Sequence, residues 1–309
     1  MLIGVILLLL LGVAWTIEGC MYSITAEKKL NFTYVFLGCA ILNVVVGCAL
    51  LPFQPMPDFH DRTVLILLGV IFSAGLATYT SAFLLTKSME SGPNGILWAI
   101  YQAAMLFPFS IGILVHGDAA TVTRLVGIGA LTIGILLLGV GGDLKKQAKA
   151  KASSGSRWRW LLPGVASFFV NGLAQYLMTI SSRYPEALDQ LTNINRTTVL
   201  NLGIIAAGLV YSFAHGELTK RSSRHDVVMA LWMAILMAVI ALVGYYFLLF
   251  PGSDRLTAAG AGAIVYPLPV GTCIIVFTIY SLIHLREKYT IPEWLGLLLS
   301  TAGVVVISL

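Results

Sequence analysis

The fold is decided by one stretch, Ile111 to Val140, which reads IGILVHGDAATVTRLVGIGALTIGILLLGV. A degenerate copy returns as Tyr280 to Leu309, which reads YSLIHLREKYTIPEWLGLLLSTAGVVVISL. Both copies follow one plan: an apolar run, a short polar corner with an acid, and an apolar run that contains glycines. We therefore interpret the chain as two homologous halves. A shift of 169 positions pairs Thr121 with Thr290, Gly127 with Gly296, Thr132 with Thr301, Gly134 with Gly303, and Asp118 with Glu287.

The composition indicates a polytopic membrane protein of the all-α class. Hydrophobic residues make up 58% of the chain and charged residues only 11%, against about 25% charged in soluble domains. One crossing needs about 20 apolar residues, which predicts ten transmembrane helices. They are Leu2 to Tyr22, Phe32 to Phe53, Val64 to Leu85, Gly95 to Val115, Val122 to Val140, Trp160 to Ile180, Thr192 to Phe213, Val227 to Phe250, Ala259 to Leu282 and Ile291 to Leu309.

These spans divide into two five-helix repeats, residues 1–142 and residues 160–309. Because five is an odd number, the second repeat must enter the membrane in the opposite direction, so we expect inverted repeats. The linker 143–159 is rich in Lys, Ala, Ser and Gly and shows no apolar periodicity. Such a segment is expected to be a flexible tether.

The basic residues predict the orientation in the membrane. Of the 19 Lys and Arg residues, 14 fall in the loops on one side, including the linker 143–159. Cytoplasmic loops carry the excess of Lys and Arg, so we expect a cytoplasmic linker and both termini outside the cytoplasm, in an inner (plasma) membrane. The net charge of +5 is this orientation signal, and no nucleic-acid partner is expected. The first span is expected to be retained rather than cleaved, because nothing basic precedes Leu2.

Cofactor and metal chemistry find little support in the residue pattern. The cysteines all fall inside spans without a Cys-x-x-Cys pair, and no two histidines are four residues apart. We therefore expect no metal, no disulfide framework and no cofactor. The four cysteines are Cys20, Cys39, Cys48 and Cys273.

Glu18 is the only acid well inside any of the ten apolar stretches. Ionisable residues inside spans commonly face a water-filled cavity or a partner and mark transport or proton paths. Removal of a carboxyl group from water favours its protonated form, so Glu18 is our candidate for proton coupling. The alternative is a shifted span in which Glu18 reaches the lipid headgroups.

Polar and aromatic residues on other spans are candidates for substrate binding. Trp98, Tyr101 and Gln102 share one helix face by their spacing, although Trp98 also fits an interfacial aromatic belt. Trp15 lies close to Glu18 on the first span, and aligning Glu18-Gly19 with Asn171-Gly172 sets polar groups at corresponding places in the two halves. Secondary transporters with inverted repeats bind substrate where the repeats meet. The substrate-binding candidates are Trp15, Trp98, Tyr101, Gln102, Asn171, Gln175, Tyr79 and Tyr266.

Prolines and one arginine complete the candidates. Pro108 should bend the fourth span, and Pro267 and Pro269 cannot both sit inside a regular helix. Non-helical backbone at membrane depth is tolerated where it lines a cavity or is buried in protein, so Pro267 and Pro269 are candidates for gating. Arg196 could attract an anionic substrate or lie at the outer headgroups, and we favour the headgroups. The glycine-bearing fifth and tenth spans are expected to pack closely, against each other or in a partner's interface.

This arrangement resembles the drug/metabolite transporter superfamily. The resemblance covers essentially the whole chain and rests on the ten spans and on the acidic corners Gly117-Asp118 and Arg286-Glu287, although the usual corner of that family is Gly-Glu. The run from Gly92-Pro93-Asn94 to Tyr101-Gln102 is similar to the sugar-uptake branch that includes rhamnose/proton symporters. The resemblance implies a central cavity lined by the first, third and fourth spans and their counterparts in the second half.

The sequence therefore predicts a secondary active transporter that works by alternating access. In this hypothesis Glu18 carries a coupling proton in symport with a small polar metabolite, for which a sugar is one candidate. Export of amino acids, nucleosides or drugs is the alternative on the same fold. A membrane enzyme for lipid-linked substrates is disfavoured because acids and histidines are scattered, so no enzymatic activity is expected. The oligomeric state stays open.

A topology reporter tests the predicted orientation. A reporter enzyme that is active only in the cytoplasm should be silent when fused after Leu309 and active when inserted into the linker 143–159, because positive loops stay inside. Reporter activity in intact cells, normalised to protein level, is the measurement. Activity after Leu309 would refute the orientation.

Overall fold

The computed structural model describes residues 1–28, 30–90, 94–149, 160–216, 224–283 and 289–308. Within these ranges all regular structure is helical and no strand occurs, as the sequence predicts. Some expectations concern residues outside the described ranges: the turn Gly92-Pro93, residues 150–159 of the linker, the acid Glu287 and the terminal Leu309.

The helices follow the expected order, with short extra turns between them. The first half contains α1 (Leu2–Glu27), α2 (Phe32–Leu50), η1 (Leu51–Phe53), α3 (Arg62–Met89), α4 (Asn94–Ala103), α5 (Leu106–Leu114) and α6 (Val122–Lys149). The second half contains α7 (Leu161–Ile180), η2 (Ser181–Arg183), α8 (Pro185–Leu188), α9 (Asn193–His215), α10 (Arg224–Leu242), η4 (Val243–Leu249), α11 (Phe250–Ala258), η5 (Gly262–Ile264), α12 (Pro267–Ile283) and α13 (Ile291–Ser308).

Eight described segments are long and apolar enough to cross a bilayer. The expected fourth and tenth spans correspond to shorter apolar helices, Ile100–Leu114 and Ile291–Ile307, so the count of ten crossings stays a prediction. The fourth span is divided between α4 and α5 at Ala104 and Met105. Pro108 explains the break because it cannot donate a backbone hydrogen bond to the carbonyl of Ala104.

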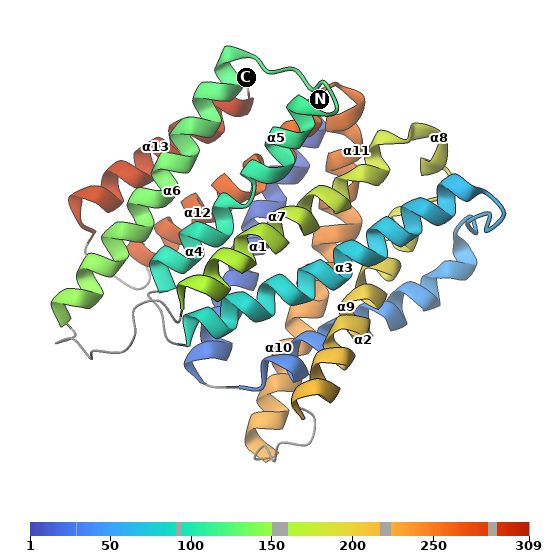
Figure 1. The fold of residues 1–309 in the computed structure, drawn as a ribbon, viewed down its shortest axis with the longest axis horizontal. Helices are drawn as coiled ribbons and strands as arrows, with labels where there is room; N and C mark the ends of the chain where they lie inside the picture. Colours follow the sequence, from blue (N-terminus) through green and yellow to red (C-terminus); the bar gives the residue numbers. More distant parts are fainter. Residues whose placement is uncertain (29, 91–93, 150–159, 217–223, 284–288, 309) are drawn as a thin grey trace.

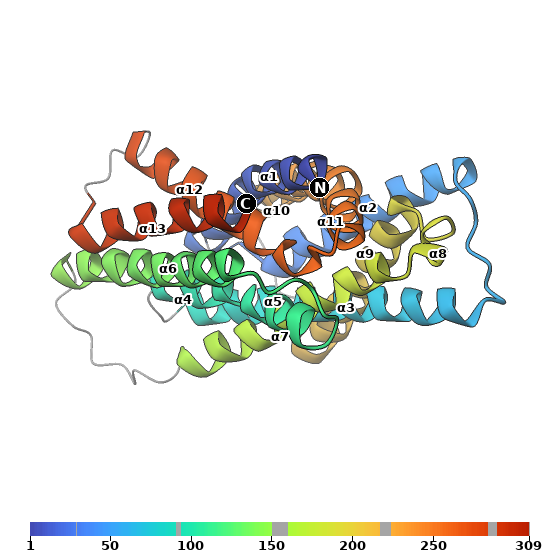
Figure 2. The same cartoon turned by 90° about the horizontal axis from the view of Figure 1, so that it is seen from above.

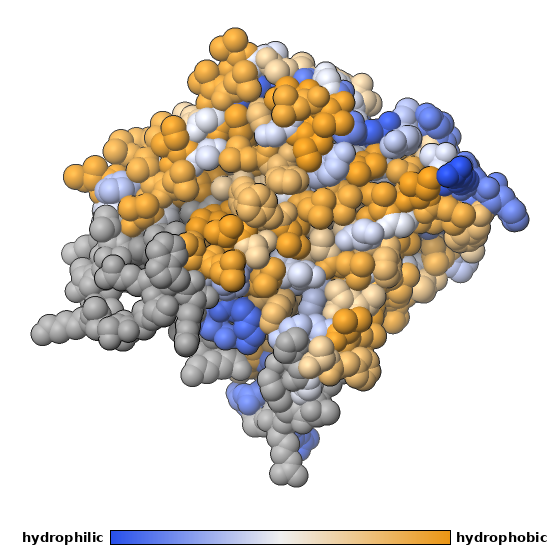
Figure 3. All heavy atoms as spheres, in the orientation of Figure 1, coloured by the Kyte–Doolittle hydropathy of each residue, from blue (hydrophilic) through white to orange (hydrophobic). Residues whose placement is uncertain are grey.

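The helices form two layers that each combine segments from both halves. Figure 2 shows α1 and α2 in one layer with α10, α11 and α12, and α3, α4, α5 and α7 in the other. Both chain ends lie on the same side as the α5–α6 corner (Figure 1). The opposite side contains the C-terminal ends of α3 and α6, which lead to the basic loops. Hydrophobic residues cover most of the face in Figure 3, as expected for a surface in contact with lipid.

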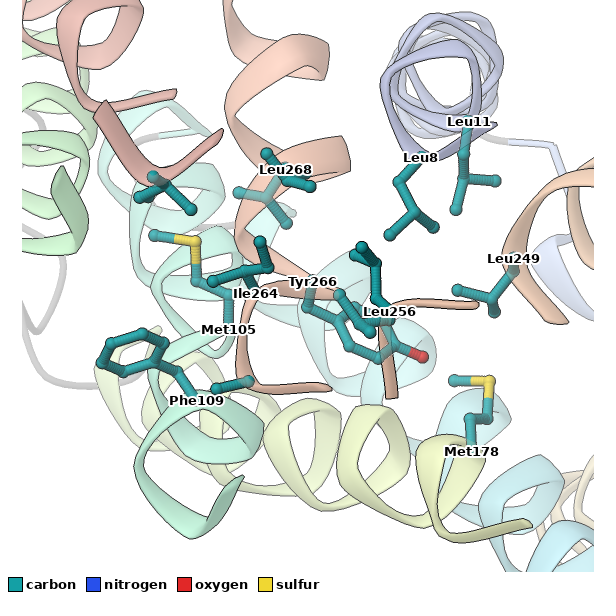
Figure 4. Packing of buried hydrophobic residues seen from close by; sticks show 14 of the residues in the cluster. Leu8, Leu11, Met105, Phe109, Met178, Leu249, Leu256, Ile264, Tyr266 and Leu268 are labelled. Atoms are coloured by element: carbon teal, nitrogen blue, oxygen red, sulfur yellow. The ribbon is translucent and has the colours of Figure 1, made fainter. Parts of the chain in front are cut away.

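The largest apolar core lies where α1, α7, α11 and α12 meet. Leu8 and Leu11 of α1 pack in it together with Leu256 of α11 and Leu268 of α12, and Figure 4 shows their side chains converging around Tyr266. Each of these side chains has less than 2% of its surface exposed. The core therefore holds Tyr266, which belongs to the irregular segment before α12, in a fixed position.

Helices α6 and α13 touch through their backbones at four glycines. A Cβ atom on Gly134 would lie 2.7 Å from the carbonyl oxygen of Gly296, and one on Gly127 would lie 3.0 Å from the carbonyl oxygen of Gly303. No larger residue fits such a contact without moving a helix. The expectation that the fifth and tenth spans pack closely is confirmed, and they pack against each other.

This contact predicts a difference between two glycines of α6. Gly134→Ala should lower the thermal stability of the purified protein, since its new methyl group overlaps backbone, and overpacking costs about 1 to 3 kcal/mol. Gly129→Ala is the matched control, because a Cβ there has no heavy atom within 4 Å and alanine favours the helix. Thermal unfolding in detergent is the measurement, and equal stability of the two variants would contradict the packing.

Candidate functional site

A cavity lies inside the helix bundle between the two layers. Its volume is about 80 Å³, which is enough for several water molecules. It is bounded by α1, α3, α4, α7, η4 and the segment before α12. The described residues that line it are Trp15, Glu18, Gly19, Tyr22, Thr78, Trp98, Tyr101, Gln102, Asn171, Gln175, Met178, Tyr245 and Tyr266.

Most of the residues that the sequence singles out meet at this cavity. Glu18 lines it together with seven of the eight substrate-binding candidates. Tyr79 is the exception, because its side chain is 1% exposed and lies in an aromatic cluster with Phe32, Phe36 and Tyr211. Its neighbour Thr78 lines the cavity instead. Consecutive residues of a helix point about 100° apart, so Tyr79 faces away.

The carboxyl group of Glu18 faces the cavity and has a single described hydrogen-bond partner. The hydroxyl group of Tyr22 donates to Glu18 Oε1 over 3.2 Å. Tyr22 lies four residues later on α1, one turn along the same face. Among the described residues Glu18 makes no ion pair, and none of the described lining residues is basic. This position disfavours the alternative in which Glu18 reaches the headgroups.

Two stacked aromatic pairs form walls of the cavity. Trp15 stacks on Tyr266 with ring centroids 5.9 Å apart, and Trp98 stacks on Tyr101 at 5.8 Å. Gly19 permits the second pair to approach α1, because a Cβ atom there would lie 3.2 Å from the ring of Trp98. Trp98 therefore belongs to the interior wall rather than to an interfacial belt.

The break between α4 and α5 is tied to α7 at the cavity. Asn171 Nδ2 donates to the backbone carbonyl of Tyr101 over 3.2 Å, close to the point where α4 ends. The Tyr101 hydroxyl group is 3.5 Å from Ser81 Oγ on α3, and Gln102 Nε2 is 3.9 Å from the sulfur of Cys273. The polar groups of this wall are thus held in place by contacts to three other helices.

The two prolines begin a helix instead of interrupting one. Pro267 is the first residue of α12 and Pro269 lies in its first turn, where a missing N–H group leaves no intrahelical bond unmade. The expected non-helical backbone precedes them: residues 261–266, which include η5, are all buried. The ninth span therefore starts with an irregular segment that is buried in the protein. Tyr266 is the last residue of this segment and lines the cavity.

Several lining residues were not among the sequence-based candidates. Tyr22 and Met178 could have been found by helical spacing, because they lie four residues after Glu18 and three after Gln175. Tyr245 could not, since it belongs to the π-helical segment η4, in which the wider turn changes the direction of the side chains. Such segments are rare and have no clear sequence pattern.

Different kinds of contact lie on the two sides of the cavity along the helix bundle. Toward the chain termini, Arg183 of η2 forms a two-bond ion pair with Asp118 of the α5–α6 corner, at 3.1 and 2.8 Å. A Cβ atom on Gly112 would lie 2.6 Å from Asp118 Oδ2, so this glycine makes room for the carboxylate. Partial burial lowers the pKa of nearby His116, and the charge of Arg183 acts in the same direction. On the opposite side, Tyr22 stacks on Phe36 at 5.9 Å.

Arg196 has neither of the roles that the sequence suggested. Only 1% of it is exposed, and its guanidinium group pairs with Asp254 of α11, with Arg196 Nη1 2.8 Å from Asp254 Oδ1. It also lies over the ring of Phe250, 4.5 Å from its centroid. Both the headgroup contact and the free anion-binding role are wrong, because the side chain is enclosed by protein and its charge is paired with Asp254.

Comparison with known proteins places the chain among membrane transporters. No protein-family model matches it. A crystal structure described only as that of a protein has a similar fold over 98% of this chain and 95% of its own, with a TM-score of 0.61 and 12% identity. The nicotine metabolites export pump subunit NepB of Paenarthrobacter nicotinovorans is 27% identical over 38% of this chain and 67% of its own.

The multidrug resistance protein mmr of Mycolicibacterium paratuberculosis is 32% identical over 110 residues, which are 36% of this chain and 97% of that protein. Almost the whole of mmr thus aligns with about a third of this chain. Together with the apolar helices, this match establishes a multi-pass membrane protein of the transporter class. The chain belongs to the family of multidrug resistance protein mmr.

Proposed function

We propose that this protein is a secondary transporter that exports small organic molecules with a positive charge in exchange for protons. The observation that carries the proposal is the Glu18 carboxyl group in an aromatic cavity whose described lining contains no basic residue. A carboxylate attracts a cation directly, and aromatic faces add cation–π attraction. An anion would meet no positive charge among the described lining residues, and the carboxylate of Glu18 would repel it.

The relatives support export over uptake. One of them is named an export pump subunit for nicotine metabolites and the other a multidrug resistance protein. Uptake of a sugar, which the sequence favoured, finds no such support, and the wider assignment to the drug/metabolite transporter superfamily and its sugar-uptake branch stays a prediction. Export is therefore the better proposal.

Inverted repeats, which alternating access by this fold would use, are supported by contacts that occur in equivalent pairs. The shift of 169 positions converts the contact between Gly127 and Gly303 into the contact between Gly296 and Gly134, and both are close. Similarly, α3 packs on α7 and α9, while α10 with its continuation packs on α1 and α2. Two halves related by a two-fold axis would produce this pairing.

Alternating access further requires that the contacts on the two sides of the cavity open in turn. The ion pair between Arg183 and Asp118 joins the two halves and is nearly buried, with side-chain exposures of 12% and 5%. The N–H group of Ala119 also donates to the carbonyl of Gly260, over 3.4 Å. We take the contacts of Asp118 and Ala119 as the gate on the side of the chain termini. Pro267 and Pro269 fix the start of α12, which is the helix that we expect to move.

Glu18→Gln tests the proton exchange. The amide cannot release a proton, so the variant should lose accumulation of an organic cation driven by a pH gradient while counterflow exchange of that cation persists at a lower rate. Uptake of ethidium into inside-out vesicles, with and without the gradient, is the measurement. Glu90→Gln is the control, because Glu90 is an exposed partner of Lys87. Unchanged gradient-driven uptake would reject the role of Glu18.

A charge exchange tests the gate. Asp118→Asn and Arg183→Gln should each open the cavity toward the side of the termini, because removal of one partner from a buried ion pair is strongly destabilising. A cysteine reporter at Thr78 should then react about tenfold faster with a membrane-impermeant thiol reagent, which corresponds to about 1.4 kcal/mol. The double variant Asp118→Arg with Arg183→Asp should restore slow labelling. Equal labelling in all variants would contradict the gate.

A further inference from the structure

Two buried polar atoms, on residues that line the cavity, have no hydrogen-bond partner among the described residues. They are the side-chain oxygen of Gln175 and the hydroxyl group of Tyr266. Both side chains are deeply buried, with 5% and 1% of their surface exposed. Asn171, Tyr101 and Glu18, by contrast, have side-chain contacts within the protein. Among the described residues that line the cavity, Gln175 and Tyr266 are the two with a buried side-chain atom that lacks a partner.

The two residues lie on different elements within the second half of the chain. Gln175 lies on α7, and Met178 lies three residues later on the same face. Figure 4 shows the hydroxyl end of Tyr266 directed toward Met178, while stacking on Trp15 holds its ring. Glu18 and its partner Tyr22 lie on α1. The cavity thus has two kinds of polar group. The acid Glu18 lies on α1, while the unpaired amide oxygen and the unpaired hydroxyl group lie on α7 and before α12.

A buried acceptor without a donor destabilises the protein, and a ligand that supplies the donor gains binding free energy by removing this penalty. A cavity of this volume has room for water that hydrogen-bonds to polar lining groups. A ligand that displaces this water without replacing its hydrogen bonds loses affinity. The amide oxygen of Gln175 can only accept a bond, so the required ligand group is an N–H or O–H.

We propose that Gln175 and Tyr266 form a second polar subsite, which binds an N–H or O–H group of the same organic cation whose charge lies at Glu18. The inference rests on the proposed function and narrows its substrate class. The transported cations carry a hydrogen-bond donor separated from the charged nitrogen. Cations that are hydrophobic throughout bind more weakly, because they leave both polar atoms unpaired.

Two matched ligand series test the subsite. The first is (ω-hydroxyalkyl)trimethylammonium with chains of two to six carbons, and the second is alkyltrimethylammonium of the same lengths. Both carry the same charge and differ by one hydroxyl group. Calorimetric binding to the full-length protein in detergent should show an optimum length at which the hydroxylated ligand binds about tenfold more tightly, as expected for a buried group that gains its partner.

Conservative variants test whether Gln175 and Tyr266 cause the tighter binding of the hydroxylated series. Gln175→Met keeps a side chain of similar length without an acceptor, and Tyr266→Phe keeps the ring that stacks on Trp15. Each should bring the affinity ratio of the two series toward one, and the double variant should abolish the preference. Glu18→Gln should weaken both series together and leave the ratio near its original value. Glu90→Gln should have no effect on either series.

The outcomes separate the two proposals. An unchanged ratio in Gln175→Met and in Tyr266→Phe would overturn the subsite, and so would failure of both series to bind to the unaltered protein. Binding with the expected preference but without transport in proteoliposomes would support the subsite and reject the proposed export. A variant that unfolds would lose binding of both series, whereas the subsite predicts a change in their ratio.

Discussion

The structure depends on one constraint, a carboxyl group within an apolar membrane span. A charged side chain at the centre of a span costs about 2.5 to 3.5 kcal/mol or more, so the surrounding helices must supply either a partner or water. At Glu18 they supply a small cavity, one hydroxyl donor and a ring of aromatic side chains. Bulky stacked pairs line the cavity, whereas glycines bring the backbones of α6 and α13 together.

Two other acids, Asp118 and Asp254, show how an arginine can neutralise a carboxylate in this fold. Asp118 and Asp254 each receive two hydrogen bonds from an arginine, which neutralises them and joins helices. Glu18 has no such partner among the described residues, although arginines are used for this purpose nearby in the fold. In the proposed function, the missing partner leaves the carboxyl group free to exchange between a proton and an external cation. Glu18 thus differs from Asp118 and Asp254 in lacking an arginine partner among the described residues.

Much of this arrangement can be predicted from sequence because it follows from periodicity. Apolar runs predicted the helices, repeated glycines predicted the contact of α6 with α13, and helical spacing brought Trp98, Tyr101 and Gln102 to one face. The failures have a different cause. Tyr79 points away because one residue rotates a helix by about 100°, and Tyr245 depends on a π-helical turn. The pairing of Arg196 with Asp254 depends on two distant helices, which no local pattern reports.

The two halves contribute different side chains to the cavity. Under the repeat that we propose, α1 and α7 are counterparts, yet α1 supplies the acid Glu18 while α7 supplies the amides Asn171 and Gln175. The relative mmr aligns over nearly its whole length with about a third of this chain. Joining two halves in one chain allows each to change independently. In the proposed function, the first half supplies the carboxyl group that binds the charge, and the second supplies neutral groups that recognise the remainder of the substrate.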